Sequence, residues 1–307
     1  MKKVLIFGYG GFVGPYLAKE FLGDKYTVVG SDINPSTVLK DVKFVECNIL
    51  DAVKVKETIL EFLPDLIINL AAISSVALSW EEPSKTISIN VVGSLNILDA
   101  AKFLSNKPKI LFVGSSEEYA ICDKPIKESN TTDANNPYGI SKLFLEKLVK
   151  LYKQKYGMKI YCVRSFNHTG VGQKEQFALP SFCKQVAEIV KTGKARKIYV
   201  GNLDVKRDFS DVRDIVRAYK MIIESNDDET IYNLGSGKAY LLSELLEYII
   251  SLSKLEIKVI RDEKKYRPND NPIVCCDNTL IKSRLGWKPE FSIKDTLKEM
   301  FNYYLNN

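Results

Sequence analysis

The chain has few of the residues on which several kinds of site depend. Its 307 residues include one histidine, His168, and six cysteines that form no Cys-x-x-Cys pair and no cluster with the histidine. A zinc site is therefore not expected, and adjacent Cys275 and Cys276 would make a poor disulfide. No Gly-x-Ser-x-Gly pattern occurs, which argues against an α/β hydrolase. We expect reduced thiols, no metal, and a structural hydrogen bond as the role of His168.

Long apolar runs and blocks of one charge are also missing. No stretch approaches the roughly 20 apolar residues of a membrane span, and the apolar start is too short for a secretory signal. Basic side chains exceed acidic ones by 44 to 38, but the lysines are scattered. We therefore expect a cytoplasmic protein with no nucleic-acid or membrane partner, whose surface suits an anionic small molecule.

A glycine-rich turn follows the first predicted strand, Val4–Phe7, and precedes a helical pattern through Leu22. This order of strand, glycine turn and helix is typical of dinucleotide sites. The first glycine allows a tight turn, the second lets backbone approach a pyrophosphate, and the third lets the helix pack on the strand. The pyrophosphate would rest on N–H groups at the start of the helix. The residues that we expect to hold it are Gly8, Gly11, Phe12, Val13 and Gly14.

An acidic residue, Asp32, ends the second predicted strand, 18 residues after Gly14. A carboxylate there accepts hydrogen bonds from both adenosine ribose hydroxyls and repels a 2′-phosphate. Neither arginine nor lysine follows directly in the run Ser31–Asn34. The sequence therefore favours NAD(H), with NADP(H) as the other possibility. The alternative interpretation of Asp32 is a loop cap.

Apolar strands alternate with helical patterns along the first half of the chain. This alternation predicts an α/β fold, a doubly wound parallel sheet of the Rossmann type. Residues 1–166 are expected to form the NAD(P)-binding domain. The alternation breaks down after Asn167, so residues 167–307 are expected to form mainly a smaller C-terminal α/β substrate lobe, with some segments packing back. The predicted strands are 4–7, 26–31, 42–47, 66–70, 109–114 and 159–164, and the predicted helices include 53–63, 84–104 and one from about 137 to 156.

Tyr138 and Lys142 lie four residues apart in the last of these predicted helices, on one helical face. A lysine ammonium held there favours phenolate and would lower the tyrosine pKa from its usual value of about 10. Any amphipathic helix can carry such a pair. The glycine turn at the start of the chain is what makes a catalytic role credible.

Together these elements resemble the extended short-chain dehydrogenase/reductase family, in its nucleotide-sugar branch. Within that branch the second half is most similar to GDP-6-deoxy-4-keto-D-mannose reductases. The related GDP-mannose 4,6-dehydratases usually have tryptophan where Phe209 stands, and a longer chain. The resemblance covers nearly the whole chain and rests on the glycine turn, Asp32, Asn48–Asp51, Leu70–Ala72, Asn90–Asn96, Ser115, Tyr138, Lys142, Arg164–His168 and Arg207–Phe209.

The resemblance implies reduction of the C4 ketone of a nucleotide 4-keto-6-deoxy sugar, with GDP-4-keto-6-deoxy-D-mannose to GDP-D-rhamnose favoured. Tyr138 would donate a proton to the carbonyl oxygen, and Lys142 would lower the tyrosine pKa and bind the nicotinamide ribose. Ser115 would donate a second hydrogen bond to the developing alkoxide. Glu117 occupies the place where 4,6-dehydratases carry a glutamate that moves a C5 proton. Its alternative role is to touch a sugar hydroxyl.

The resemblance also implies binding residues and an assembly. Arginine suits a diphosphate because its planar fork pairs bidentately with phosphate oxygens. A homodimer is expected through the helices near 84–104 and 137–156, with Ile89, Val92, Leu95, Asn96 and Leu143 as candidate contacts. The further cofactor residues would be Asn48, Ile49, Leu70, Ala71 and Ala72, with Tyr138 and Lys142. The substrate residues would be Ser74, Ser75, Asn167, Lys184, Arg207, Arg267 and Asp270.

Two alternatives to the reductase stay open. A GDP-mannose 4,6-dehydratase, or another nucleotide-sugar dehydratase or epimerase, would return its hydride internally and consume no coenzyme. The other alternative is a non-catalytic NAD-binding sensor. Such proteins usually lack the catalytic Tyr/Lys pair, which this chain has as Tyr138 and Lys142. Guanine is the favoured base of the nucleotide sugar, with uracil and thymine as the other candidates.

Overall fold

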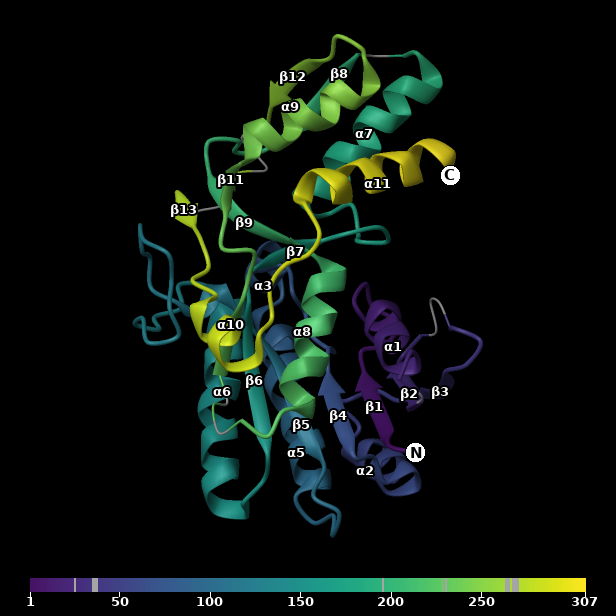
Figure 1. Cartoon of the computed structure of the whole chain (residues 1–307), viewed down its shortest axis with the longest axis vertical. Helices are drawn as coiled ribbons and strands as arrows, with labels where there is room; N and C mark the ends of the chain where they lie inside the picture. Colours follow the sequence, from purple (N-terminus) through teal and green to yellow (C-terminus); the bar gives the residue numbers. More distant parts are fainter. Residues whose placement is uncertain are drawn as a thin grey trace.

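Seven parallel strands form the central sheet of the chain, in the order β10-β6-β5-β4-β1-β2-β3 (Figure 1). The computed structural model describes residues 1–24, 26–34, 38–194, 196–227, 229, 231–262, 266 and 271–307. The sheet confirms the predicted doubly wound α/β fold. Its strands are β1 (Lys3–Phe7), β2 (Thr27–Asp32), β3 (Lys43–Glu46), β4 (Leu66–Asn69), β5 (Lys109–Ser115), β6 (Ile160–Ser165) and β10 (Ile231–Leu234).

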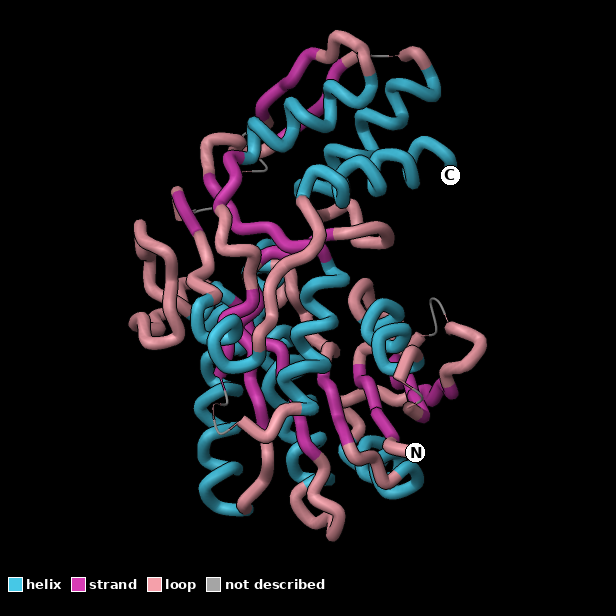
Figure 2. The backbone as a smooth tube through the Cα atoms, in the orientation of Figure 1, coloured by secondary structure: helices cyan, strands magenta, loops and turns pink. Residues whose placement is uncertain are grey.

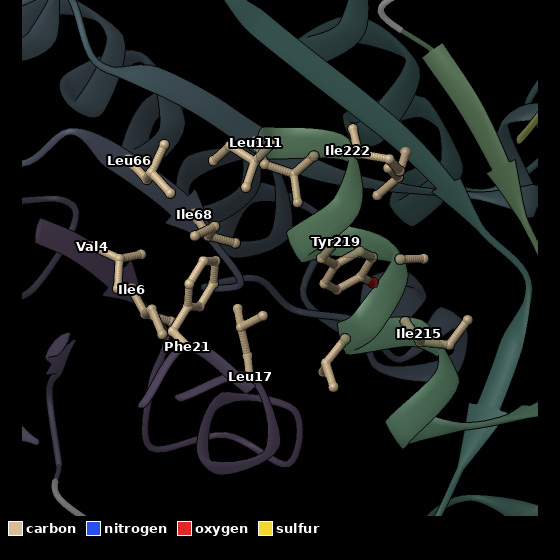
Figure 3. Close-up of a cluster of buried hydrophobic side chains, with 14 of the residues drawn as sticks. Val4, Ile6, Leu17, Phe21, Leu66, Ile68, Leu111, Ile215, Tyr219 and Ile222 are labelled. Atoms are coloured by element: carbon tan, nitrogen blue, oxygen red, sulfur yellow. The ribbon is translucent and has the colours of Figure 1, made fainter. Parts of the chain in front are cut away.

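Helices cover both faces of this sheet. Side chains alternate between the faces, so Val4 and Ile6 enter one apolar core while Leu5 and Phe7 enter the other. Because both faces of the sheet are buried, the sequences of these strands are nearly continuous apolar runs. In Figure 3, Phe21 and Tyr219 come from helices packed on the first face. That face carries α1 (Gly14–Leu22), α8 (Val212–Glu224) and α10 (Thr279–Leu285), and the other carries α2 (Ala52–Phe62), α5 (Gly93–Ala101) and α6 (Pro137–Tyr156).

The chain leaves the central sheet after β6 but returns to it. The predicted boundary at residue 166 falls between β6 and β7, and α8 and β10 are later segments that pack back on the first half. A second, four-stranded sheet is built around β9 (Lys206–Asp211). Its other strands are β7 (Asn167–Thr169), β11 (Ala239–Leu241) and β13 (Ile273–Val274). This sheet lies between the central sheet and a helical cluster that includes the C-terminus (Figure 2).

The helical cluster has an apolar core of its own. Helix α7 packs against α9 and α11, and a parallel strand pair lies beside them (Figure 1). The elements are α7 (Ala178–Thr192), β8 (Lys197–Val200), α9 (Leu242–Ser253), β12 (Lys258–Arg261) and α11 (Ile293–Asn306). None of the helices in the described part of the chain is long and apolar enough to cross a membrane.

The helix predicted from 84 to 104 is not regular. It consists of α4 (Pro83–Ile87), a π-helical segment η1 (Ser88–Val92) and α5, preceded by the short α3 (Val76–Glu81). Asn90 in the π segment is buried. Its side chain exchanges two hydrogen bonds with the backbone of Ile73, at 2.8 and 3.0 Å, and donates a third to the Ser141 hydroxyl at 2.9 Å. These bonds hold the π-helical turn against the loop after β4 and against α6. The predicted long helix near 84–104 is therefore present from Pro83 to Ala101, with a π segment in its middle.

Candidate active site

The glycine turn lies at the carboxyl edge of the central sheet, where β1 meets β4. From these two strands the chain winds in opposite directions, which is where doubly wound sheets bind ligands. Gly8 has a positive φ of 78°, and a Cβ there would lie 2.4 Å from the Ala71 nitrogen. Only glycine fits this position. The structure therefore brings the predicted turn together with the predicted segment Leu70–Ala72.

The start of α1 fits a pyrophosphate group. A Cβ on Gly14 would lie 2.0 Å from the Tyr9 carbonyl oxygen, so glycine lets the helix begin directly against the turn. No side chain caps this helix at Val13. The first N–H groups of an uncapped helix form an anion site. Gly11, Phe12 and Val13 lie in the same turn, as the dinucleotide prediction requires.

Asp32 ties the end of β2 to the glycine turn. One carboxylate oxygen accepts a hydrogen bond from the Gly10 N–H at 3.0 Å, and the other accepts one from the Ile33 N–H at 2.7 Å. The carboxylate thus makes the loop-capping contact that was the alternative interpretation. A carboxylate has about four acceptor positions, so it also has capacity for a ribose hydroxyl.

Asn48 and Ile49 follow β3, the strand next to Asp32. The Cys47 N–H donates to the Asp32 carbonyl oxygen at 3.0 Å, which fixes this loop at the same edge of the sheet. The Ile49 carbonyl oxygen accepts a hydrogen bond from the Asn96 side chain at 2.8 Å, and Asn48 accepts one from the Leu50 N–H at 3.0 Å. Asn96, a candidate dimer contact, is therefore used inside the protomer.

Ser115 and Tyr138 meet where β5 ends and α6 begins. The Ser115 hydroxyl lies close enough to the phenol to lower the pKa of Tyr138. The Ser115 hydroxyl also accepts from the Glu117 N–H at 3.1 Å, within the 3₁₀ turn η2 (Ser116–Glu118). The Tyr138 N–H donates to the Ser79 hydroxyl at 3.2 Å. Both residues are buried, so the phenol is held in place on several sides.

The pKa of Tyr138 differs from the prediction. Burial raises it above its ordinary value, and the negative charges of Glu117 and Glu118 raise it further, while the Ser115 hydrogen bond lowers it. Burial is the largest of these effects because it excludes water from the phenolate, and the net shift is opposite to the lowering expected from Lys142. Tyr138 is therefore a protonated phenol at neutral pH, which is the form that a proton donor needs.

Lys142 lies one turn along α6, with its ammonium nitrogen 5.8 Å from the centre of the Tyr138 ring. It donates a hydrogen bond to the Val113 carbonyl oxygen at 2.7 Å. Burial lowers its pKa to about 8, and the charge of Glu118 opposes that shift. Its charge consequently changes close to neutral pH.

Glu117 is fastened to the helix that carries Tyr138. It accepts a hydrogen bond at 2.8 Å from the side chain of Asn136, which also caps α6 by accepting from the Gly139 N–H at 2.9 Å. A Cβ on Gly139 would lie 2.3 Å from the Glu117 carbonyl oxygen. Asn136 was not among the predicted site residues, although an asparagine directly before a proline such as Pro137 is a common helix start.

The predicted substrate residues are spread over three regions. Ser75 caps α3 by accepting from the Leu78 N–H at 3.2 Å, and Ser74 lies exposed beside it. Asn167 and Arg207 lie on the neighbouring strands β7 and β9 of the four-stranded sheet. Arg267 and Asp270 lie outside the described residues.

Lys184 in α7 is paired with other groups. Its ammonium contacts Glu175 at 2.7 Å and Glu188 at 3.8 Å on the helical cluster.

Glu118, which was not among the predicted site residues, is fully buried near Ser115. In the part of the chain that the structure describes, no group of three or more His, Cys, Asp or Glu side chains could hold a metal ion.

The family model described as GDP-mannose 4,6 dehydratase matches residues 5–300. The chain belongs to this family. A GDP-6-deoxy-D-mannose reductase of Pseudomonas aeruginosa is 32% identical, over 78% of this chain and 80% of that protein. A GDP-mannose 4,6 dehydratase of Homo sapiens is 28% identical, over 97% of this chain and 89% of that protein.

Solved structures show the same fold. RMD from Pseudomonas aeruginosa complexed with NADPH superposes with a TM-score of 0.87 at 27% identity, over 100% of this chain and 99% of that one. The UDP-glucose 4-epimerase of Thermotoga maritima with UDP-glucose gives a TM-score of 0.90 at 25% identity, over 99% of both chains. The predicted class is thereby confirmed: the chain is an NAD(P)-dependent enzyme of the nucleotide-sugar oxidoreductase type.

Proposed function

We propose that the chain reduces the C4 ketone of a nucleotide 4-keto-6-deoxy sugar, with GDP-4-keto-6-deoxy-D-mannose as substrate and GDP-D-rhamnose as product. The observation that carries this proposal is the buried phenol of Tyr138, which lies near the buried Ser115 hydroxyl at the sheet edge that also carries the glycine turn. The similarity to a GDP-6-deoxy-D-mannose reductase at 32% identity supports the choice of sugar.

The residues of the site divide the proton chemistry between them. The glycine turn would hold a reduced nicotinamide coenzyme, which when bound would supply a hydride to C4 and leave negative charge on the carbonyl oxygen. Tyr138 donates its proton to that oxygen, and Ser115 donates a hydrogen bond that stabilises the developing alkoxide. The ammonium of Lys142 stabilises the phenolate that Tyr138 becomes.

We propose NADH as the preferred coenzyme. The Asp32 carboxylate at the end of β2 would repel a 2′-phosphate, and two of its hydrogen bonds hold it at the glycine turn. The solved structure of RMD contains NADPH, so both coenzymes belong in the assay. Asn48 and Ile49 would lie against the adenosine, and Leu70–Ala72 against the nicotinamide half.

The substrate would lie between the two halves of the chain, with residues 167–307 forming most of its binding lobe. Asn167, Arg207 and Arg267 would hold the diphosphate, with Asp270 toward the nucleoside and Ser74 and Ser75 toward the hexose. Lys184 would reach the diphosphate only by leaving Glu175 and Glu188.

We also propose a homodimer formed by α6 and the segment α4–η1. These elements pack side by side, and three apolar side chains of α6 are exposed, namely Ile140, Phe144 and Leu151. Ile87 and Val92 are exposed on the neighbouring segment. Of the candidates from the sequence, Val92 fits this face, whereas Ile89 and Leu95 pack against the core of their own protomer.

A 4,6-dehydratase is the second candidate, and Glu117 favours it. The Asn136 hydrogen bond holds this carboxylate beside the helix start that carries Tyr138, where it could take a proton from C5. The GDP-mannose 4,6-dehydratases of Vibrio cholerae and Homo sapiens each match 97% of this chain, which also supports this candidate.

Two incubations separate these functions. With NADH and GDP-4-keto-6-deoxymannose, the reductase predicts stoichiometric loss of the NADH absorbance and a product identified by NMR as GDP-D-rhamnose. With GDP-mannose alone, a dehydratase would form the 4-keto sugar with no net coenzyme consumed. A chain that binds NADH but turns over neither sugar would be a coenzyme sensor. The absence of turnover with both NADH and NADPH would refute the reductase.

A further inference from the structure

A group of charged side chains, most of them buried, surrounds a small cavity that Lys142 also lines. Arg164 in β6 pairs with both oxygens of Glu146, at 2.9 and 2.6 Å. Its remaining hydrogen bonds go to the Tyr119 hydroxyl at 2.7 Å and to a backbone carbonyl. Four of the five N–H donors of the Arg164 guanidinium are thus used, two of them in a bidentate pair with Glu146.

Glu118 is differently placed. One carboxylate oxygen accepts from the Ser115 N–H at 2.7 Å, which links it to the residue that touches Tyr138. The other oxygen has no hydrogen bond among the described residues and lies 3.7 Å from the Arg164 guanidinium. The side chain is fully buried, and an incompletely bonded buried carboxylate is costly, so it indicates a partner with hydrogen bonds to offer.

A small cavity supplies the place for that partner. It has a volume of about 10 Å³ and is lined by Phe112, Val113, Gly114, Glu118, Lys142, Leu145, Glu146 and Cys162. This volume is close to the minimum for one water molecule. Because the cavity is so small, a single water would contact Glu118 and Lys142 at the same time. The ammonium has three donors, of which Val113 takes one.

We propose that Glu118 is a positioning residue for Lys142, and that the two side chains hold one water molecule between them in this cavity. Glu118 and Lys142 then form a further ion pair through this water, in a cluster that already holds the ion pairs Arg164–Glu146 and Arg164–Glu118. The Glu118 carboxylate fixes the ammonium under Tyr138 and favours its charged form. Removing that carboxylate should make Lys142 lose its proton at lower pH.

The direction of this effect follows from the surroundings of Lys142. Burial lowers the Lys142 pKa to about 8, and the charge of Glu118 is the first of the effects that raise it again. Burial, and after it the charge of Glu146, raises the pKa of Glu118 to about 8, while the Ser115 N–H and the charges of Arg164 and Lys142 lower it. Each group therefore favours the ionised form of the other. The titratable and charged groups around Lys142 are Glu118, Tyr138, Glu146, Cys162 and Arg164.

The proposal can be tested on the free enzyme without any substrate. The Lys142 titration is followed by ¹³C NMR of lysine labelled at Cε, and its signal is assigned by its loss in Lys142→Arg. In Glu118→Gln the amide oxygen can still accept from the Ser115 N–H, but the charge is gone. We expect the Lys142 midpoint to fall by at least about one pH unit. An unchanged midpoint in a folded Glu118→Gln protein would overturn the proposal.

A matched control separates this effect from a loss of fold. Asp214 is also a fully buried carboxylate, and it accepts N–H groups of Glu290 and Phe291 far along the chain from Lys142. Asp214→Asn should leave the Lys142 midpoint where it is. If it moved that midpoint as far as Glu118→Gln does, the titration would report stability and not the ion pair.

A kinetic cycle adds a second readout, which depends on the proposed reductase activity. Glu118→Gln should lower kcat in the wild-type background but cause no further loss in a Lys142→Ala background, because Glu118 acts through Lys142. Equal losses in both backgrounds would overturn the proposal. A wild-type enzyme with no reductase turnover would instead count against the proposed function. The NMR titration would then still decide the role of Glu118.

Discussion

The rings of Phe12 and His168 stack, with their centroids 6.3 Å apart and their planes at 12° to one another. Phe12 belongs to the glycine turn, and His168 belongs to β7 of the four-stranded sheet. Nearby, the Tyr16 hydroxyl donates a hydrogen bond to the Val171 carbonyl oxygen at 2.8 Å. The proposed cofactor turn and the proposed substrate lobe are therefore in direct contact.

His168→Ala should weaken this contact without touching the chemistry. Burial lowers the pKa of His168, so the ring is neutral at pH 7 and is not an acid for the reaction. We expect a loss of about 1 kcal/mol in the free energy of unfolding, measured with urea, and nearly unchanged kcat. His168→Phe, which keeps a stacked ring, should recover most of the stability. A large fall in kcat in both variants would show that His168 takes part in catalysis.

Asp32→Ala should change the choice of coenzyme. Removing the carboxylate removes its repulsion of a 2′-phosphate, so the ratio of kcat/KM for NADPH to that for NADH should rise about tenfold or more. Activity with NADH should fall because the Gly10 N–H loses its acceptor. Asp65→Ala makes the same charge change beside Lys3, at the opposite edge of the sheet, and should leave the ratio unchanged. An unchanged ratio in Asp32→Ala would contradict the proposed role.

The rate of reduction should depend on the charge of Lys142. Its pKa is lowered to about 8, so the ammonium is present below that pH and is lost as the pH rises through it. We expect kcat/KM to decline above about pH 8. Lys142→Arg keeps a charge at every accessible pH, and any activity that it retains should not show this decline. A wild-type profile that stays flat to about pH 10 would contradict the assignment.

Phe144→Asp should produce a monomer. Phe144 is half exposed on α6, in the apolar face that we propose as the dimer contact, and a carboxylate there would be desolvated in the dimer. Sedimentation velocity should show the mass of one chain for this variant and of two for the wild type. Ile121→Asp alters an equally exposed apolar residue in a loop and should remain dimeric. A wild-type monomer would refute the proposed assembly.

Much of the fold could be predicted, because apolar runs and the alternation of strands and helices along the chain are local features of the sequence. The strands 66–69 and 109–115 and the glycine turn were predicted within a residue or two. The resemblance to a known family assigned Ser115 and Tyr138 to the same carbonyl oxygen. In the structure both side chains are buried, and the Ser115 hydroxyl lies close enough to Tyr138 to lower the pKa of the phenol.

Tertiary contacts decided what the sequence could not indicate. The π segment at Ser88–Val92 depends on Asn90 reaching Ile73, a contact across 17 residues. The sequence suggested that Lys142 lowers the pKa of Tyr138, but the degree of burial, which sets the opposite direction, is a property of the folded chain. Glu118 follows Glu117 directly, and no local pattern tells which of two adjacent glutamates is buried.

The central claim is that Tyr138 gives its proton to the oxygen of a ketone while the adjacent carbon receives a hydride. Tyr138→Phe removes one hydroxyl from a buried ring and should leave the fold and the NADH affinity intact. Measured by stopped-flow loss of the NADH signal under saturating GDP-4-keto-6-deoxymannose, the variant should reduce the sugar about 10²–10⁴ times more slowly than the wild type. An unchanged rate in the folded, NADH-binding variant would contradict the account.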